Sequence, residues 1–120
     1  MASSIQDVTD ATFETAVLQA ENPVLVYCWV PEVAGSPWDI GPALAQVSGM
    51  FQGNVTIVRM DLGANPMTRD AYDQMRDAYN QHRLPAMVLF KQGVPVAVQA
   101  QPMPLLPPEA LVSMFVGRNL

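Results

Sequence analysis

The chain has 120 residues, which is enough for one domain with a single hydrophobic core. Half of its residues are hydrophobic and 14% are charged, a composition typical of globular rather than disordered proteins. The formal net charge of −5 argues against nucleic acid or an anionic membrane as a partner, because both bind basic surfaces. No apolar run approaches the roughly 20 residues of a membrane-spanning helix.

The single cysteine, Cys28, excludes an internal disulfide and a zinc site built from several cysteines. The first residues, Met1–Asp7, have neither the basic region nor the apolar stretch of a signal peptide. We therefore expect one domain over residues 1–120, located in the cytoplasm and working without a metal or another cofactor.

Two strands and a helix are predicted in the first quarter of the chain. Ile5–Val8 is a short apolar strand, and a helix follows to about Ala20 with either Thr9 or Asp10 as its N-cap. The run Val24–Trp29 is continuously apolar and rich in β-branched and aromatic residues, which predicts a strand buried on both faces.

The turn after this buried strand is where α/β folds usually place their chemistry. The apolar spacing that follows predicts a helix over Pro37–Phe51, with Ser36 as its N-cap. The turn residues Ala34, Gly35, Ser36 and Pro37 include no metal ligand, acid or base, and an unassisted serine is a poor nucleophile. The position therefore indicates an active site, whereas the residue types do not.

A strand over Val55–Asp61 and a third helix from Pro66 to about Gln81 come next, the helix capped by Asn65. This helix contains a repeat, because Arg-Asp-Ala-Tyr at 69–72 recurs at 76–79. Its predicted buried stripe is Met67, Ala71, Met75, Ala78 and His82. The repeat indicates either a surface helix extended by two turns or a docking face that displays Tyr72 and Tyr79.

The C-terminal part is predicted as a hairpin and a closing helix. Strands Ala86–Lys91 and Val94–Ala100 flank a tight turn, and a proline-rich loop over Gln101–Pro107 follows. The last helix covers Pro108–Val116, with Gly117 as its C-cap. The complete order, β-α-β-α-β-α-β-β-α, predicts an α/β fold with a central mixed β-sheet flanked by helices on both faces.

This order of elements resembles that of the thioredoxin family. The segment Leu84-Pro85-Ala86 is similar to the family's Ile-Pro-Thr, whose proline is cis, and Pro42 is similar to the proline that kinks the active-site helix. The likeness also includes Thr9-Asp10, Phe13, Thr15, Val17-Leu18, Ala20, Leu25, Val26, Trp29, Asp61, Asn65-Pro66, Leu89-Phe90-Lys91, Gly93 and Asn119-Leu120. The resemblance covers nearly the whole chain and implies a thioredoxin fold.

The departures from the family pattern lie at its active site. Thioredoxin activity needs Trp-Cys-Gly-Pro-Cys at the strand-to-helix turn, where this chain has Val33-Ala34-Gly35-Ser36-Pro37. The family's buried carboxylate falls at Tyr27, and Cys28 lies inside the buried strand, where a thiol is inert. The resemblance therefore implies a redox-inactive member, which we expect not to be an enzyme.

The binding groove of the family is the feature that remains. We expect this groove to hold an extended protein or peptide segment, so that the chain acts as a chaperone, co-chaperone or assembly factor. The N-terminal domain of the chaperedoxin family and the thioredoxin-like chaperones of hydrogenase maturation are the most similar types. The groove residues that the resemblance implies are Val33, Ala34, Gly35, Ser36, Pro37, Trp38, Leu62, Leu84 and Pro85.

Two other functions are compatible with the sequence. The chain could be a structural subunit or adaptor that binds through its long third helix, for which Tyr72 and Tyr79 would have to be exposed. It could also be an enzyme that uses Cys28 as a single thiol, for which that cysteine would have to be reachable.

Overall fold

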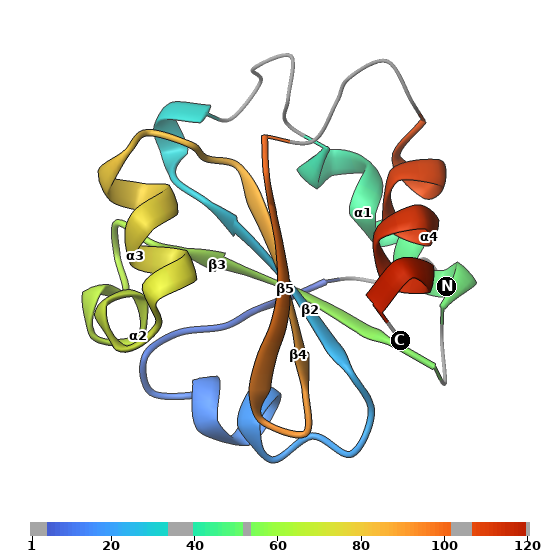
Figure 1. The fold of residues 1–120 in the computed structure, drawn as a ribbon, viewed down its shortest axis with the longest axis horizontal. Coiled ribbons are helices and arrows are strands. Elements are labelled where there is room, and N and C mark those ends of the chain that lie inside the picture. Colours follow the sequence, from blue (N-terminus) through green and yellow to red (C-terminus); the bar gives the residue numbers. More distant parts are fainter. Residues whose placement is uncertain (1–4, 34–39, 52–53, 102–106, 120) are drawn as a thin grey trace.

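The computed structural model describes residues 5–33, 40–51, 54–101 and 107–119, which form one sheet covered by helices (Figure 1). The strands follow the order β1-β3-β2-β4-β5. They are β1 Gln6–Asp7, β2 Val24–Trp29, β3 Thr56–Asp61, β4 Ala86–Lys91 and β5 Val94–Ala100. The strands β1, β3 and β2 run parallel, while β4 is antiparallel to both β2 and β5. This arrangement confirms the predicted mixed sheet and thioredoxin fold.

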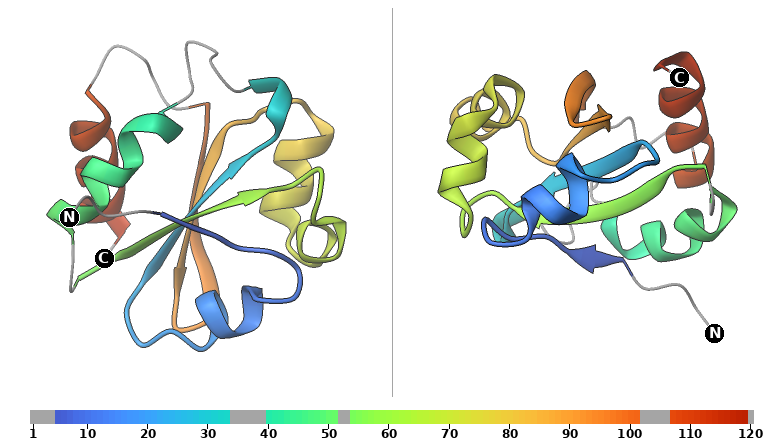
Figure 2. Two further views of the ribbon diagram at one scale, coloured as in Figure 1. Left: turned by 180° about the vertical axis from the view of Figure 1, so that it is seen from behind. Right: turned by 90° about the horizontal axis from the view of Figure 1, so that it is seen from below.

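The helices cover both faces of the sheet. They are a π-type helix η1 at Glu14–Leu18, a 3-10 helix η2 at Pro31–Val33, and the α-helices α1 Gly41–Met50, α2 Pro66–Ala71, α3 Asp73–Asn80 and α4 Pro108–Asn119. Figures 1 and 2 show α2 and α3 on one side of the sheet and α1 with α4 on the other. No helix within the described ranges is long and apolar enough to cross a membrane.

Two hydrophobic cores form, one on each face of the sheet. Val26 and Val88 pack with Val17 of η1 and Met75 of α3 in the first core. The second core joins the other face of β2 and β4 to α1 and α4 through residues that include Leu25, Leu44, Leu89, Leu111 and Phe115. Because both faces are covered, β2 and β4 carry the continuous apolar runs that the sequence shows.

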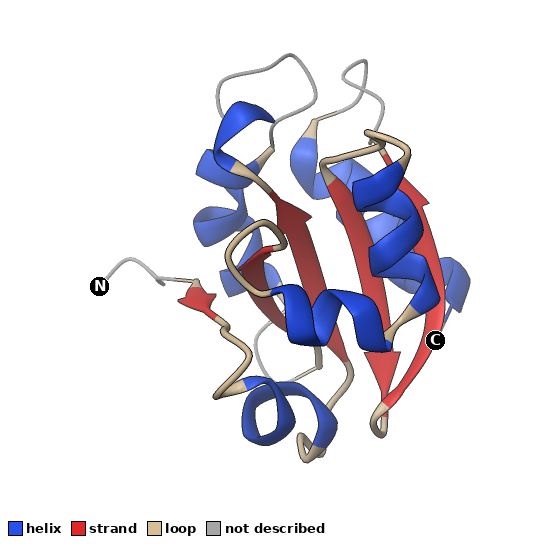
Figure 3. Cartoon of the chain, turned by 90° about the vertical axis from the view of Figure 1, so that its left-hand side faces the viewer, coloured by secondary structure: helices blue, strands red, loops and turns tan. Residues whose placement is uncertain are grey.

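The third predicted helix is two helices rather than one. Tyr72 has an extended backbone, with φ −124° and ψ 121°, and separates α2 from α3. In Figure 3, which views the molecule from the side of α2 and α3, separate helices with different directions lie in front of the sheet. The change of direction breaks the predicted stripe, because Met75 is fully buried whereas Met67 is 77% exposed. The heptad repeat preserves a buried face only along a continuous helix. The prediction of one helix to Gln81 was therefore wrong.

The capping of α2 also differs from the prediction. Asp10, expected to cap the helix that follows it, instead accepts hydrogen bonds from the backbone N–H groups of Met67 and Thr68, at 3.3 and 2.8 Å. Asn65 makes no side-chain cap bond; its Nδ2 donates to the carbonyl of Asp61 and its Oδ1 accepts from the Asp10 N–H. The unpaired backbone N–H groups at the start of α2 are therefore capped by a side chain that is 58 positions from Thr68 in the sequence.

The bounds of the remaining helices differ in smaller ways. The helix α1 begins at Gly41, after a non-helical Ile40, while Ser36 and Pro37 lie outside the described residues. The helix α4 continues past Gly117 to Asn119, so the predicted C-cap was wrong. The hairpin turn is confirmed, because Gln92 and Gly93 both have positive φ, of 53° and 80°. At Gly93 an added Cβ would lie 3.0 Å from the Leu18 carbonyl oxygen.

Candidate functional site

A hollow of about 280 Å³ lies beyond the C-terminal end of β2. Among the described residues, three apolar and three polar side chains line it, namely Val30, Val33, Leu84, Glu32, Tyr79 and His82. The 3-10 helix η2 forms one wall, and the C-terminal end of α3 with the turn after it forms the other. Ends of parallel strands are the usual binding position in open α/β sheets.

The segment that leads into β4 forms the base of this hollow. The Leu84–Pro85 peptide bond is cis, as the resemblance implied. Leu84 is 5% exposed and belongs to the first hydrophobic core, while Pro85 is buried. The carbonyl of Pro85 accepts a hydrogen bond from the Gln101 N–H at 2.6 Å, so the end of β5 holds this segment in place.

A second hollow, of about 400 Å³, adjoins the first. It shares Val30, Glu32 and Tyr79 with the first hollow, and Pro31, Asp61, Gly63 and Ala64 complete its lining. Two carboxylates, of Glu32 and Asp61, therefore line the second hollow, whereas Glu32 is the one carboxylate among the described residues of the first.

Tyr79 is one of the side chains that line both hollows, and Arg69 contacts its ring. The guanidinium carbon of Arg69 lies 4.2 Å from the centroid of the Tyr79 ring, which is a cation–π contact. Arg69 also donates to the Leu62 carbonyl at 3.1 Å and to Asp70 Oδ1 at 3.1 Å. Side chains from α2 and α3 thus orient a half-buried aromatic ring beside the two hollows.

The predicted groove residues are only partly brought together. Val33 and Leu84 line the first hollow, with Pro85 next along the chain. Leu62 is fully buried in the first core and presents no side-chain surface there. The other predicted groove residues, Ala34, Gly35, Ser36, Pro37 and Trp38, lie outside the described residues.

Sequence reasoning missed three polar residues of the site, Glu32, Tyr79 and His82. We predicted His82 in the buried stripe of the third helix, which was wrong because His82 is exposed, and Tyr79 on a surface helix or docking face. The available signal was position, because the residues from 79 to 84 lead directly into the Leu-Pro segment. A helix that ends just before a predicted binding loop should bring its last turn to that loop.

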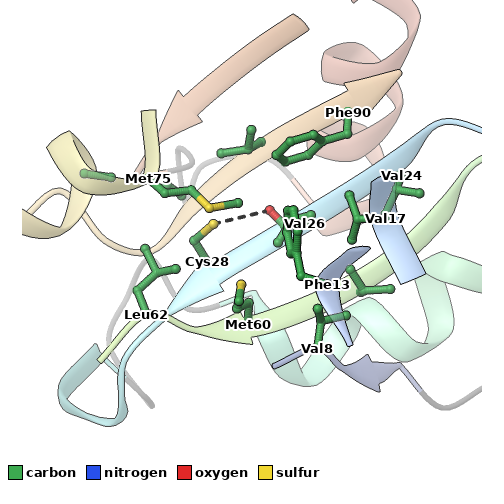
Figure 4. Close-up of a cluster of buried hydrophobic side chains, with 14 of the residues drawn as sticks. Val8, Phe13, Val17, Val24, Val26, Cys28, Met60, Leu62, Met75 and Phe90 are labelled. Atoms are coloured by element: carbon green, nitrogen blue, oxygen red, sulfur yellow. Dashed lines mark hydrogen bonds between the residues drawn. The ribbon is translucent and has the colours of Figure 1, made fainter. Parts of the chain in front are cut away.

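Cys28 lies within the core and is fully buried, among Leu62, Met60 and Met75 in Figure 4. Its Sγ donates to the Val26 carbonyl at 3.8 Å. Burial raises the pKa of the Cys28 thiol to about 12, so the thiol stays protonated at neutral pH. This placement argues against a reaction at Cys28, which needs an accessible thiolate. In the described part of the chain, no three His, Cys, Asp or Glu side chains are placed to share a metal ion.

Tyr72 is a core residue rather than a docking residue. Its ring lies 5.6 Å from that of Phe13 and 5.2 Å from that of Phe90, in an aromatic cluster that packs against the first core. Burial raises the pKa of the Tyr72 hydroxyl. Both repeat tyrosines are therefore half-buried and packed, which counts against binding through an exposed tyrosine face.

The order of the strands, the Leu-Pro segment and the hollow beside it define a thioredoxin-like protein. The family model described as Thioredoxin matches residues 4–105. The chain is 31% identical to thioredoxin C-2 of Corynebacterium nephridii over 120 residues, the whole of both chains. It is 34% identical to thioredoxin of Pseudomonas aeruginosa over 93 residues, which are 78% of this chain and 79% of that one. The chain belongs to the thioredoxin family.

These relatives correct one expectation. We expected that the chain is not an enzyme, and this was wrong, because relatives matching most of its length are named thioredoxins, which are oxidoreductases. The expectation depended on the absence of the Cys-Gly-Pro-Cys segment and of the buried carboxylate, and on the position of Cys28 inside a strand. These departures concern dithiol exchange within one chain, and they do not exclude an activity for the whole fold.

Proposed function

We propose that this member of the thioredoxin family binds an extended segment of another protein in the hollow beside Pro85. In this proposal it acts as a chaperone, co-chaperone or assembly factor, and it does not exchange disulfides through a dithiol at the turn. One observation supports the proposal: a hollow partly lined by apolar side chains lies next to the Leu84–Pro85 segment, while the single thiol is buried in the core.

The chemistry of the hollow supports this use. Val30, Val33 and Leu84 provide an apolar surface that gains free energy when it is covered. The phenol of Tyr79 and the imidazole of His82 provide hydrogen-bonding groups at the same hollow. Sites that bind segments of protein commonly hold an apolar anchor side chain in a pocket with polar groups at its rim.

The proposal is tested by removing apolar surface from the hollow. Val33→Ser removes methyl groups from the lining, and Val94→Ser makes the same change at an exposed position on β5. The probe is a fluorescently labelled peptide of leucine, serine and glycine, and the measurement is the dissociation constant by fluorescence polarisation. We expect Val33→Ser to weaken binding about tenfold, since two buried methyl groups contribute about 1.6 kcal/mol.

The control defines the contrary result. We expect Val94→Ser to bind the peptide as the wild type does, because Val94 lies on the hairpin strand and not in the hollow. If the wild type does not bind the peptide, or if both variants weaken binding equally, the proposed use of the hollow is wrong. Leu84 is less suitable for this test, because it belongs to the hydrophobic core and a polar side chain there would destabilise the fold.

A further inference from the structure

We propose that the segment bound in the hollow carries a lysine or arginine two residues from an apolar side chain, and that Glu32 and Asp61 receive this cation. This inference rests on the proposed function and specifies the chemistry of the partner. It makes Glu32 and Asp61 specificity-determining residues of the site.

The arrangement of the two hollows supports this pattern. They share Val30, Glu32 and Tyr79, so they are adjacent along one surface. In an extended segment, residues i and i+2 point to the same side and lie roughly 7 Å apart. An apolar side chain in the first hollow would therefore direct the next side chain on that face into the second.

The charges in the second hollow fit a cation. Glu32 is exposed there, and Asp61 contributes a second carboxylate. Oδ1 of Asp61 accepts hydrogen bonds from the N–H groups of Gly63 and Ala64, at 2.9 and 3.2 Å. These bonds fix the carboxylate in place and leave its other oxygen as a further acceptor. The net charge of −5 also favours the approach of a basic partner.

No lysine, arginine or histidine is among the described residues that line the second hollow. The guanidinium of Arg69 lies on the Tyr79 ring and is engaged by Asp70 and by the Leu62 carbonyl. His82 lines the first hollow and not the second. Arg83 lines a different hollow, between α3 and β5.

The experiment compares three labelled peptides that differ at one position, containing Leu-Ser-Lys, Leu-Ser-Gln or Leu-Ser-Glu in a serine and glycine background. Partly exposed ion pairs contribute about 1 kcal/mol at most, so we expect the lysine peptide to bind the wild type about fivefold more tightly than the glutamine peptide. The glutamate peptide should bind least tightly. Raising the salt concentration should reduce these differences, because the carboxylates are open to solvent.

Three variants test whether the preference for the lysine peptide comes from this site. Glu32→Gln should reduce the ratio of lysine-peptide to glutamine-peptide affinity toward one. Glu109→Gln removes the same charge from an exposed position on α4 and should leave the ratio unchanged. Val33→Ser should weaken binding of all three peptides and preserve the ratio.

Failure of this inference is distinct from failure of the proposed function. Equal affinity of the wild type for the lysine and glutamate peptides would overturn the charge preference and leave apolar capture intact. An equal loss of preference in Glu32→Gln and Glu109→Gln would also overturn it, since only the overall charge would then matter. Absence of binding for every peptide would overturn both.

Discussion

The interior of the sheet differs from the edge at which its parallel strands end in how deeply its side chains are buried and in how polar they are. In the interior, β2 and β4 are almost entirely buried, and the thiol of Cys28 bonds only to its own strand. At the C-terminal edge, Asp10, Asn65 and Asp61 form a hydrogen-bonded chain beside the open hollow. The interior therefore supplies stability, and the edge supplies the groups that can meet a partner.

The strongest test of this difference places a charge in the interior. Tyr27 is 2% exposed, and the resemblance implied the family's buried carboxylate at this position. We expect Tyr27→Asp to destabilise the protein by about 4 kcal/mol or more, because it buries an unpaired carboxylate and leaves a cavity. Urea denaturation followed by circular dichroism measures the change, and Tyr27→Phe is the control that keeps the ring. A Tyr27→Asp midpoint equal to that of the wild type would contradict a closed interior.

Thiol labelling tests the same interior without a mutation. Cys28 is fully buried with its pKa raised to about 12, so reagents should reach it only when the structure opens. With an opening free energy of at least about 4 kcal/mol, labelling at pH 8 should be about a thousandfold slower in the native than in the urea-unfolded protein. Mass spectrometry of the alkylated protein gives both rates. Equal rates would show that the thiol is accessible.

At the polar edge, we expect Asp10 to contribute to the free energy of unfolding. Partial burial alone would raise the pKa of Asp10, but the hydrogen bonds from Thr68 and Met67 outweigh it, so the pKa of Asp10 lies below its ordinary value of 3.8. We expect Asp10→Ala to cost about 1 kcal/mol at pH 7, the usual value of a lost helix cap. Urea titrations of both proteins measure this difference.

The same carboxylate predicts how the difference depends on pH. Because the folded pKa is lowered, the stabilisation is present above the unfolded value of 3.8 and is lost as the pH falls through the folded pKa. The stabilities of the wild type and Asp10→Ala should therefore converge as the pH approaches 2. A difference that is constant from pH 7 to pH 2 would mean that the carboxylate charge does not contribute.

The smallest effect is expected on the exposed side of α2. Met67 is 77% exposed, so Met67→Ala should change the free energy of unfolding by less than about 0.5 kcal/mol. Met75 is fully buried, and Met75→Ala should cost about 2–5 kcal/mol. If urea titrations gave comparable effects for the two changes, Met67 and Met75 would lie on one buried face, as the predicted single helix requires.

Most of the fold could be predicted from the sequence, because the signals are local. The apolar run of β2, the turn at Gln92-Gly93 and the strands beside it were predicted with their observed bounds. The site could be predicted only in part. Val33, Leu84 and Pro85 came from the resemblance, whereas Glu32, Tyr79 and His82 reach the hollow from elements whose direction no local pattern specifies.

Composition and periodicity alone determined which strands are central, where the hairpin turns and that the thiol lies inside a buried strand, because each depends on neighbouring residues. Only the tertiary structure decided that Asp10 caps α2 and that Tyr72 interrupts the third helix. The cap joins segments 58 positions apart, and the ring of Tyr72 packs against Phe13 and Phe90. Such long-range contacts outweigh a helical repeat whose intrinsic preference is weak.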